Sequence, residues 1–343
     1  MRREEALGDF LKKGDEMLTA REPLFWERLF VRKAEIVSRF RESLTRLERR
    51  CGACAKECRY IYCSLLRVDL LKSRYLTLIQ AVGEDYALDP DPVEELLDLG
   101  DFFDELEAVR VDLIHGLPQY NGKVGAGDVQ KLTAERAVEW FWKIGFLLRF
   151  LLCVPENREE IMAIIPAKFP RIVRWGEYRD RGETIFFYEE EPDREGERFK
   201  TLLRQSYSYP YILQARHLHR GEYERMSLEE KRMEYTAFEG CSFRGVSFAG
   251  AGLFGARFLE CRFKNCSFRE ADLAMARFES CEFQDVDWER AGIAKTLCLP
   301  GPPPGLSEEQ KKEILVKEEQ YNAAVFLCGT GQEGPGHHSS GGI

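Results

Sequence analysis

The chain has 343 residues, of which 44% are hydrophobic and 32% are charged, and its formal net charge at pH 7 is -9. This composition is ordinary for a folded protein in water and argues against a fibrous or disordered chain. The length suffices for two or three domains. The acidic balance argues against non-specific binding to nucleic acids.

The start of the chain has the mixed charges of a surface segment, without the apolar core of a signal peptide, so we expect no secretion by that route. Eleven cysteines in such a chain indicate a reducing, cytoplasmic compartment in which most thiols stay unpaired. The most apolar stretch, 137–154, contains Glu139, Lys143 and Arg149. We therefore expect a buried or amphipathic helix there and no membrane span.

The first part of the chain is predicted to be mainly helical, because apolar residues recur at three- and four-residue spacing in four segments. These segments are 24–50, 64–82, 93–109 and 134–153. Turn residues separate them, including the Asp-Pro repeat at 89–92 and the glycine-rich stretch 122–127. The latter lacks the Gly-Lys-Ser/Thr ending of a phosphate loop, so we interpret it as a flexible connection.

Four cysteines within thirteen residues form the one group in this region that could carry chemistry: Cys51, Cys54, Cys58 and Cys63. Thiolates ligate zinc and iron–sulfur clusters, and the glycine inside the first Cys-x-x-Cys step allows a tight turn. Neighbouring basic residues are expected to lower the thiol pKa values. These are Arg49, Arg50, Lys56 and Arg59. The pattern is incomplete, however, because the usual zinc site has two Cys-x-x-Cys halves.

The same cysteines also fit a structural role, since Cys51, Cys54 and Cys58 would share one face of a continuous helix and pack as small apolar residues. A redox dithiol is a third interpretation. The first two hypotheses differ in geometry. A metal site requires the helix to break between Gly52 and Tyr62, whereas the structural role predicts an unbroken helix with Cys63 apart from the others.

After the helical region, the segments 171–175 and 184–188 flank a turn and predict a β-hairpin. The polar and aromatic stretch 198–233 is predicted to return to helix and to cap the open end of the domain that follows. Within it, His217 and His219 flank Leu218. Two imidazoles without a third ligand indicate a solvated helix surface more than a metal site.

From Phe238 to Ile293 a bulky apolar residue occupies every fifth position, a period that neither a helix nor a flat strand has. A small or compact residue precedes each by two places, and the leucines and isoleucine at 253, 273 and 293 recur every twenty residues. Four five-residue units therefore make one turn of a solenoid, and twelve units make about three coils. The cysteines at the inward positions are expected to be core residues. They are Cys241, Cys261, Cys266 and Cys281.

The segment 236–295 resembles the pentapeptide-repeat family, whose unit A-(D/N)-L-x-x is matched by Ala271-Asp272-Leu273. The resemblance implies a right-handed quadrilateral β-helix in which the central residue and the one two before it point inward. The other three positions of each unit are then expected to face solvent. Their charged side chains are Glu239, Arg244, Arg257, Glu260, Arg262, Lys264, Arg269, Glu270, Asp272, Arg277, Glu279, Glu282, Asp285, Asp287, Glu289, Arg290 and Lys295.

The predicted fold class is therefore α+β, with a mainly α-helical N-terminal domain followed by a short right-handed quadrilateral β-helix of about three coils. The expected domains are 1–170 (helical, with the cysteines), 171–235 (hairpin and helical cap), 236–295 (solenoid) and 296–343 (Pro/Gly linker, one short helix at 307–321 and a disordered tail).

For function, the sequence contains no nucleophile elbow, His-Glu-x-x-His motif or kinase set, which favours a non-enzymatic protein–protein interaction scaffold with an unknown protein partner. The alternative is a metal-binding (zinc or iron–sulfur) enzyme or sensor that uses the four clustered cysteines. Some members of the family resemble duplex DNA and protect topoisomerases. The solenoid charges, nine acidic and eight basic, are too balanced for that role, because duplex DNA carries about one negative charge per 1.7 Å.

Overall fold

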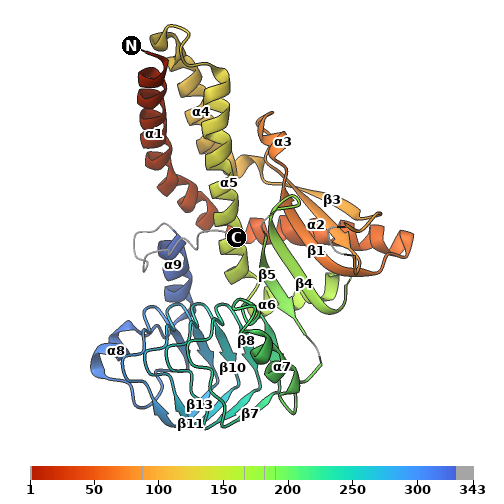
Figure 1. Cartoon of the computed structure of the whole chain (residues 1–343), viewed down its shortest axis with the longest axis vertical. Helices are drawn as coiled ribbons and strands as arrows, with labels where there is room; N and C mark the ends of the chain where they lie inside the picture. Colours follow the sequence, from red (N-terminus) through yellow and green to blue (C-terminus); the bar gives the residue numbers. More distant parts are fainter. Residues whose placement is uncertain (1, 86–87, 166, 181, 190, 330–343) are drawn as a thin grey trace. The chain divides into compact units, whose positions relative to one another are not determined.

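The computed structural model describes residues 2–85, 88–165, 167–180, 182–189 and 191–329 (Figure 1). The chain divides into two compact units. The first comprises Met1–Phe186 together with Phe326–Ile343, and the second comprises Phe187–Val325. The tail expected to be disordered falls almost wholly outside the described residues.

The first unit is rich in helices, as predicted. The long ones are α1 (Arg3–Val31), α2 (Lys33–Cys54), α4 (Asp104–Gly116) and α5 (Ala126–Leu151), and the short ones are α3 (Arg67–Leu70), α6 (Pro155–Ile164), η2 (Gly100–Phe103) and η3 (Leu117–Tyr120). The helices predicted at 24–50 and 134–153 are confirmed, although a break at Arg32 divides the first between α1 and α2. In α2 the buried residues Ile36, Phe40, Leu44 and Leu47 recur at three- and four-residue spacing and form its core-facing stripe.

A five-stranded mixed sheet completes this unit, with strand order β3-β2-β1-β4-β5. The strands are β1 (Cys58–Leu65), β2 (Leu76–Val82), β3 (Val93–Asp98), β4 (Ala167–Glu177) and β5 (Gly182–Tyr188). The strand β1 is antiparallel to β2 and parallel to β4. The adjacent β4 and β5 confirm the predicted hairpin.

Two predicted helices are wrong. The segment 64–82 forms the end of β1, the short α3 and β2, and the segment 93–109 begins as β3 and turns helical only in η2 and α4. Six of the seven residues of β2 are buried, so both faces of this strand are covered. A strand covered on both faces has a continuous apolar sequence, which the spacing of apolar residues does not distinguish from a buried helix.

Trp175 joins the sheet to α5. Its ring lies 4.3 Å from that of Phe141, centroid to centroid, and its Nε1 donates a hydrogen bond of 2.9 Å to the Phe141 carbonyl. Gly145 makes room for this contact, because a Cβ at that position would overlap the indole ring. The close approach of helix and sheet therefore depends on a residue without a side chain.

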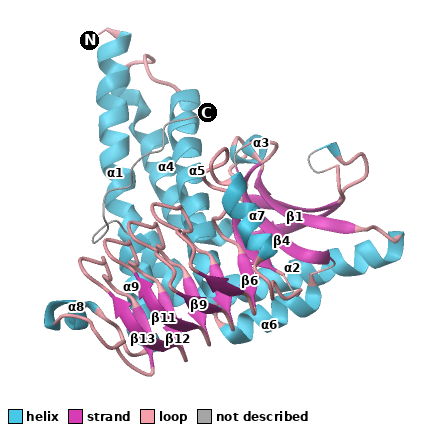
Figure 2. Ribbon diagram, turned by 60° about the horizontal axis from the view of Figure 1, so that its bottom comes forward, coloured by secondary structure: helices cyan, strands magenta, loops and turns pink. Residues whose placement is uncertain are grey.

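The second unit is a parallel β-solenoid of about four turns, between residues 217 and 299. Its strands form two sheets, β14-β12-β10-β8-β6 and β13-β11-β9-β7. They are β6 (His217–His219), β7 (Glu222–Glu224), β8 (Ala237–Glu239), β9 (Ser242–Arg244), β10 (Arg257–Leu259), β11 (Arg262–Ser267), β12 (Arg277–Glu279), β13 (Glu282–Asp287) and β14 (Leu297–Leu299). Figure 2 shows these short strands in a row.

The strand register confirms that twenty residues make one turn, because Phe238 pairs with Phe258 and Phe258 pairs with Phe278. Like aromatic rings therefore stack on one another. Phe263 lies 5.0 Å from Phe243 and 5.2 Å from Phe283, with interplanar angles of 8° and 6°. These continuous stacks fill the interior of the solenoid, as the inward assignment predicted.

The solenoid begins one turn before the twelve predicted units. Leu218, Tyr223, Leu228 and Met233 occupy the central positions of this first turn, and all are buried. Within the segment 198–233, the only helix is α7 (Glu197–Gln205), so most of the helix predicted there is wrong. The repeat pattern does not predict the first turn, because large residues such as Met226 and Lys231 lie two positions before its central residues.

Both ends of the solenoid are closed. At the first turn, Phe199 of α7 is fully buried and packs its ring edge-on against Phe238 and Tyr223. At the last turn, Trp288 donates from Nε1 to the Pro304 carbonyl at 3.1 Å. Two helices follow, α8 (Glu308–Glu313) and α9 (Glu318–Gly329), where one was predicted. These caps prevent the edge strands from pairing with another chain.

Candidate functional site

The four clustered cysteines lie at the junction of α2 and β1. The helix ends at Cys54, Ala55 takes a left-handed conformation with φ 53°, and the strand begins at Cys58. The unbroken helix predicted by the structural interpretation is therefore wrong, and the break occurs where the metal hypothesis requires one. Cys51, Cys58 and Cys63 are buried, whereas Cys54 is exposed and its Sγ contacts the Arg50 carbonyl at 3.1 Å.

Burial dominates the chemistry of these thiols. It raises the pKa of Cys51 to about 11 and that of Cys58 to about 12, and Lys56 offsets only part of the effect. Lys56 and Arg50 do lower the pKa of Cys51, but burial outweighs them, so the net direction is the opposite of the one predicted. Most of these basic side chains also have carboxylate partners of their own. Lys56 pairs with Asp89 at 2.6 Å, for example.

Within the part of the chain that the structure describes, no group of three or more His, Cys, Asp or Glu side chains is placed to hold a metal ion. Cys63 lies inside the sheet, where it pairs with Ile79 on β2 and Trp175 on β4. A zinc or iron–sulfur site at these cysteines thus remains a prediction. Elemental analysis of protein purified without chelators is its direct test.

His217 and His219 lie on β6, so the solvated helix surface predicted for them is wrong. His217 is buried and stacks on Tyr188 with ring centroids 4.8 Å apart. Its Nδ1 contacts the Glu189 backbone carbonyl at 2.9 Å, and its Nε2 lies 3.0 Å from the Glu239 carboxylate. These contacts make His217 part of the packing over the first turn.

The sheet that contains β6, β8, β10, β12 and β14 is covered on its outer side, and we call it the covered sheet. Arg257 and Arg277 are 7% and 3% exposed, so their predicted solvent exposure is wrong. The guanidinium of Arg277 binds both carboxylate oxygens of Glu318 on α9, at 2.8 and 3.0 Å. It also lies 5.0 Å from the ring centroid of Tyr321. The helix α9 thus lies over this sheet, and the repeat carries no signal of it.

The sheet that contains β7, β9, β11 and β13 is exposed on its outer side, and we call it the open sheet. Its outward residues form two rows, and all but the half-buried Ser242 are exposed. One row is Glu222, Ser242, Arg262 and Glu282, and the other is Glu224, Arg244, Lys264 and Gln284. The middle of the open sheet is basic, and acidic side chains lie at both of its edges.

The exposed charges pair along the rows. Arg244 lies 3.0 Å from Glu224, and Arg262 lies 3.5 Å from Glu282. All four side chains are more than half exposed, so each pair contributes little to stability, about 0–1 kcal/mol. The side chains remain available to another molecule, because little free energy is lost when a pair separates.

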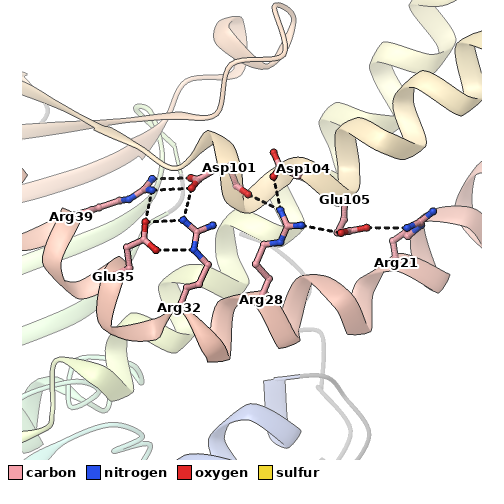
Figure 3. A network of polar contacts seen from close by, with 8 residues as sticks. All are labelled: Arg21, Arg28, Arg32, Glu35, Arg39, Asp101, Asp104 and Glu105. Atoms are coloured by element: carbon pink, nitrogen blue, oxygen red, sulfur yellow. Dashed lines mark hydrogen bonds and ion pairs between the residues drawn. The ribbon is translucent and has the colours of Figure 1, made fainter.

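A second charged group lies in the first unit, at the bend between α1 and α2 (Figure 3). The guanidinium of Arg32, at the bend, donates two hydrogen bonds of 2.7 Å to the Glu35 carboxylate. The guanidinium of Arg39 donates two to the Asp101 carboxylate, at 2.8 and 2.9 Å. The remaining members are Arg21, Arg28, Asp104 and Glu105. Four arginines balance four carboxylates, so the network joins the bend to η2 and α4 without leaving net charge for a ligand.

Comparisons with known proteins agree with this geometry in the solenoid. A family model described as "Pentapeptide repeat region" matches residues 218–297. This segment is a pentapeptide repeat region. The match includes the first turn, which the spacing of residues alone did not predict. No curated protein matches the chain in sequence.

Several solved structures of pentapeptide repeat proteins match at low identity. HetL from the cyanobacterium Nostoc sp. strain PCC 7120 is 17% identical, with 24% of this chain and 45% of HetL covered and a TM-score of 0.19. Rfr23 from the cyanobacterium Cyanothece 51142 is 15% identical, with 24% and 60% covered and a TM-score of 0.17. The protein alr5209 from Nostoc PCC 7120 is 14% identical, with 37% and 100% covered and a TM-score of 0.25. The alignment thus spans less than two thirds of the first two proteins.

Membrane insertion by a helix finds no support in the structure. None of the helices in the described residues combines the length and the apolar character needed to cross a bilayer. The apolar stretch of α5 is instead buried in the first unit, where Trp140 and Phe141 pack in the core.

Proposed function

We propose that this protein is a non-enzymatic interaction scaffold and that the open sheet of its pentapeptide repeat region binds a protein partner. The observation that carries the proposal is the contrast between the two sheets of the solenoid. One is covered by α9 and the residues around His217, and both ends are capped, whereas the open sheet carries two rows of exposed charges on a rigid core.

The rigid core favours binding, because little conformational entropy of the backbone is lost when a preformed surface docks. The charge pattern also restricts the partner. A complementary surface has acidic groups opposite Arg244, Arg262 and Lys264, and basic groups opposite the glutamates at the two edges. Such complementarity contributes more to specificity and association rate than to affinity.

The size of the open sheet predicts a transient complex. Its four strands are separated by three gaps of about 4.8 Å, so the sheet is about 14 Å high. Each side of the solenoid is about five residues of about 3.3 Å wide, which gives an area of roughly 250 Å². A stable complex buries about 800 Å² on each partner. The open sheet alone therefore supports a weak interaction, and a tighter one would have to extend onto the neighbouring side of the solenoid, where Arg269 and Arg290 lie.

Site-specific photo-crosslinking tests the proposal. A photoreactive amino acid at position 264, in the middle of the open sheet, is expected to crosslink one protein in native cell extract. The same group at position 292, which is exposed on the side of the solenoid opposite the open sheet, is the matched control. The captured protein is then purified, and its affinity is measured directly by calorimetry.

Charge reversal gives the second arm. The double variant Arg244→Glu with Lys264→Glu is expected to abolish binding of the purified partner, and raised salt is expected to weaken it, because the charges are exposed. Equal binding by the double variant and the unmodified protein would show that the partner binds elsewhere. A reproducible turnover by the purified protein, with no partner captured at either position, would overturn the scaffold function itself.

A further inference from the structure

A pocket of about 500 Å³ lies at the corner between the covered sheet and the open sheet. Three arginines from three different segments line it: Arg194 from the loop before α7, Arg220 from the first turn of the solenoid and Arg262 from the third. Two glutamates, Glu222 and Glu260, and the hydroxyl-bearing Ser242 complete its polar lining. We call this site the arginine pocket.

The arginines in this pocket are poorly neutralised. Across the described residues, neither Arg194 nor Arg220 forms an ion pair or a side-chain hydrogen bond. Arg262 has one long contact, 3.5 Å to Glu282, with both side chains more than 70% exposed. Arg244, on the neighbouring strand of the open sheet, has a closer pair at 3.0 Å. Guanidinium groups without carboxylate partners around one cavity create a positive potential directed into it.

The backbone beneath the pocket is fixed by buried contacts. Asp193, the residue before Arg194, is 5% exposed, and its carboxylate accepts hydrogen bonds from the backbone of Arg198 and Phe199 at 3.0 and 2.9 Å. Its own backbone N–H donates to the His219 carbonyl at 2.9 Å. The loop that carries Arg194 is thereby held against the first turn of the solenoid. Preorganisation of this kind lowers the entropy lost on binding.

The side chain of Arg220 is also positioned by its surroundings. A Cβ on Gly240, one turn further along the solenoid, would lie 3.3 Å from the Cγ of Arg220. The aliphatic stem of Arg220 therefore lies over Gly240, and the absence of a side chain there keeps the corner free. The backbone N–H groups of Arg220, Gly240 and Glu260 donate to carbonyls of the next turn. They are therefore not free to bind a ligand, and the side chains must supply the contacts to it.

The number of arginines favours one chemical class of ligand. One guanidinium suffices to bind both oxygens of a carboxylate, whereas a phosphate monoester offers three terminal oxygens and up to two negative charges. Three guanidinium groups match that set. Glu222 and Glu260 disfavour a bare dianion and favour a phosphate attached to a group with hydrogen-bond donors, such as an amine or an amide.

We infer that the arginine pocket binds a phosphate monoester carried by a polar molecule, with Arg194, Arg220 and Arg262 contacting the phosphate oxygens and the two glutamates contacting neighbouring donors. The phosphate could belong to a small metabolite or to a phosphorylated residue of a protein. This inference does not depend on a partner at the open sheet.

Calorimetric titration of the full chain at low salt tests the inference with three probes: inorganic phosphate, O-phosphoserine and a phosphoserine peptide with blocked ends. We expect saturable binding at millimolar or lower concentration, with both phosphoserine probes tighter than inorganic phosphate. Tighter binding of the free amino acid indicates a metabolite, and tighter binding of the peptide indicates a phosphorylated protein.

Substitutions locate the site. Arg194→Ala and Arg220→Ala are each expected to weaken binding about tenfold or more, because charge-assisted hydrogen bonds are lost. The matched control is Arg244→Ala, which removes an exposed arginine outside the pocket, and it is expected to leave the dissociation constant unchanged. No binding of any probe at millimolar concentration, or equal weakening by Arg244→Ala and Arg220→Ala, would overturn the proposal.

Discussion

Replacing Phe263 with alanine tests the aromatic stacking that holds the solenoid together. Phe263 is 1% exposed and lies between two stacked rings, those of Phe243 and Phe283. It also makes edge-on contacts with Phe248 and Phe258. The variant therefore removes a ring from the middle of a stack, where the neighbouring turns limit how far the cavity can collapse.

The surroundings of Phe263 determine how much stability the alanine variant loses. Truncation of a buried phenylalanine to alanine costs about 3–5 kcal/mol, and each aromatic pair adds about 0.5–1.5 kcal/mol beyond the area that it buries. With two stacked neighbours, Phe263→Ala is expected near the upper value, about 5 kcal/mol. Phe283 is half-buried and stacks on Phe263, so Phe283→Ala should cost about 2 kcal/mol.

The assay must report on the solenoid alone, because the chain has two units and a single unfolding transition is not assured. Hydrogen exchange of peptides that cover β11, measured by mass spectrometry in increasing urea, gives that local readout. For a urea m-value of about 2 kcal/mol/M, the loss of about 5 kcal/mol at Phe263 lowers the urea midpoint by about 2.5 M. Lys264→Ala, one residue away and exposed, is expected to leave the midpoint unchanged.

Equal destabilisation by Phe263→Ala and Phe283→Ala would refute the stacking argument, because the two positions differ in the number of stacked neighbours. Destabilisation by Lys264→Ala of a similar size would refute the inward and outward assignment. The charged variant Phe263→Asp should unfold the solenoid, since a buried unpaired carboxylate costs several kcal/mol.

Four further predictions concern single sites. Arg277→Ala is expected to destabilise the solenoid by about 2 kcal/mol in urea unfolding, below the usual loss for a fully buried pair because its carboxylate partners are partly exposed. In α5, Gly145→Ala should cost about 1–3 kcal/mol by overpacking the Trp175 ring, whereas Gly127→Ala should stabilise slightly, by about 0.5 kcal/mol. Iodoacetamide at pH 8 should modify Cys54 well before the buried thiols of its cluster, as mapped by peptide mass spectrometry. Burial of the Asp101 carboxyl raises its pKa, but hydrogen bonds from Arg39 and Arg32 outweigh this, and the net pKa is lowered. Its contribution to stability is therefore present above about pH 4 and lost as the pH falls through the folded-state pKa, and Asp101→Asn should reduce this acid sensitivity in unfolding experiments.

Each of these expectations has an outcome that contradicts it. Unchanged protection of α9 in hydrogen exchange of Arg277→Ala would show that Glu318 does not hold this helix. Equal stability of the two glycine variants would show that α5 can move away from Trp175. Rapid alkylation of Cys58 would contradict its burial, and unchanged acid unfolding of Asp101→Asn would assign the acid sensitivity to other carboxylates.

The sequence predicted the solenoid because its signal is local and strict. Phe258, Phe263 and Phe268 follow one another at five-residue spacing, and four such steps bring the chain back into register, since Phe258 pairs with Phe278 and Phe263 with Phe283. The first turn was missed because the repeat weakens there. Tyr223 and Met233 replace the usual Phe or Leu, and their neighbours two positions before are Gly221 and Lys231 rather than alanine or cysteine.

The sheet of the first unit and the surface sites could not be predicted in the same way. The residues of β2 are apolar on both faces, so their spacing carries no strand signal. The contact between Arg277 and Glu318 joins residues 41 positions apart, and the arginine pocket combines three turns of chain around one corner. Such contacts depend on how the chain returns on itself, which residue spacing does not report.

The twenty-residue turn limits how the length of this region can change. Inserting five residues before Arg277 would move that arginine, and every later side chain, to the next side of the square, so that Arg277 would no longer pair with Arg257 in the strand register and Phe278 would no longer stack on Phe258. Inserting twenty would restore both. Insertions and deletions here are therefore compatible with the fold only in steps of a whole turn. The distance between the two caps is a whole number of inter-turn spacings.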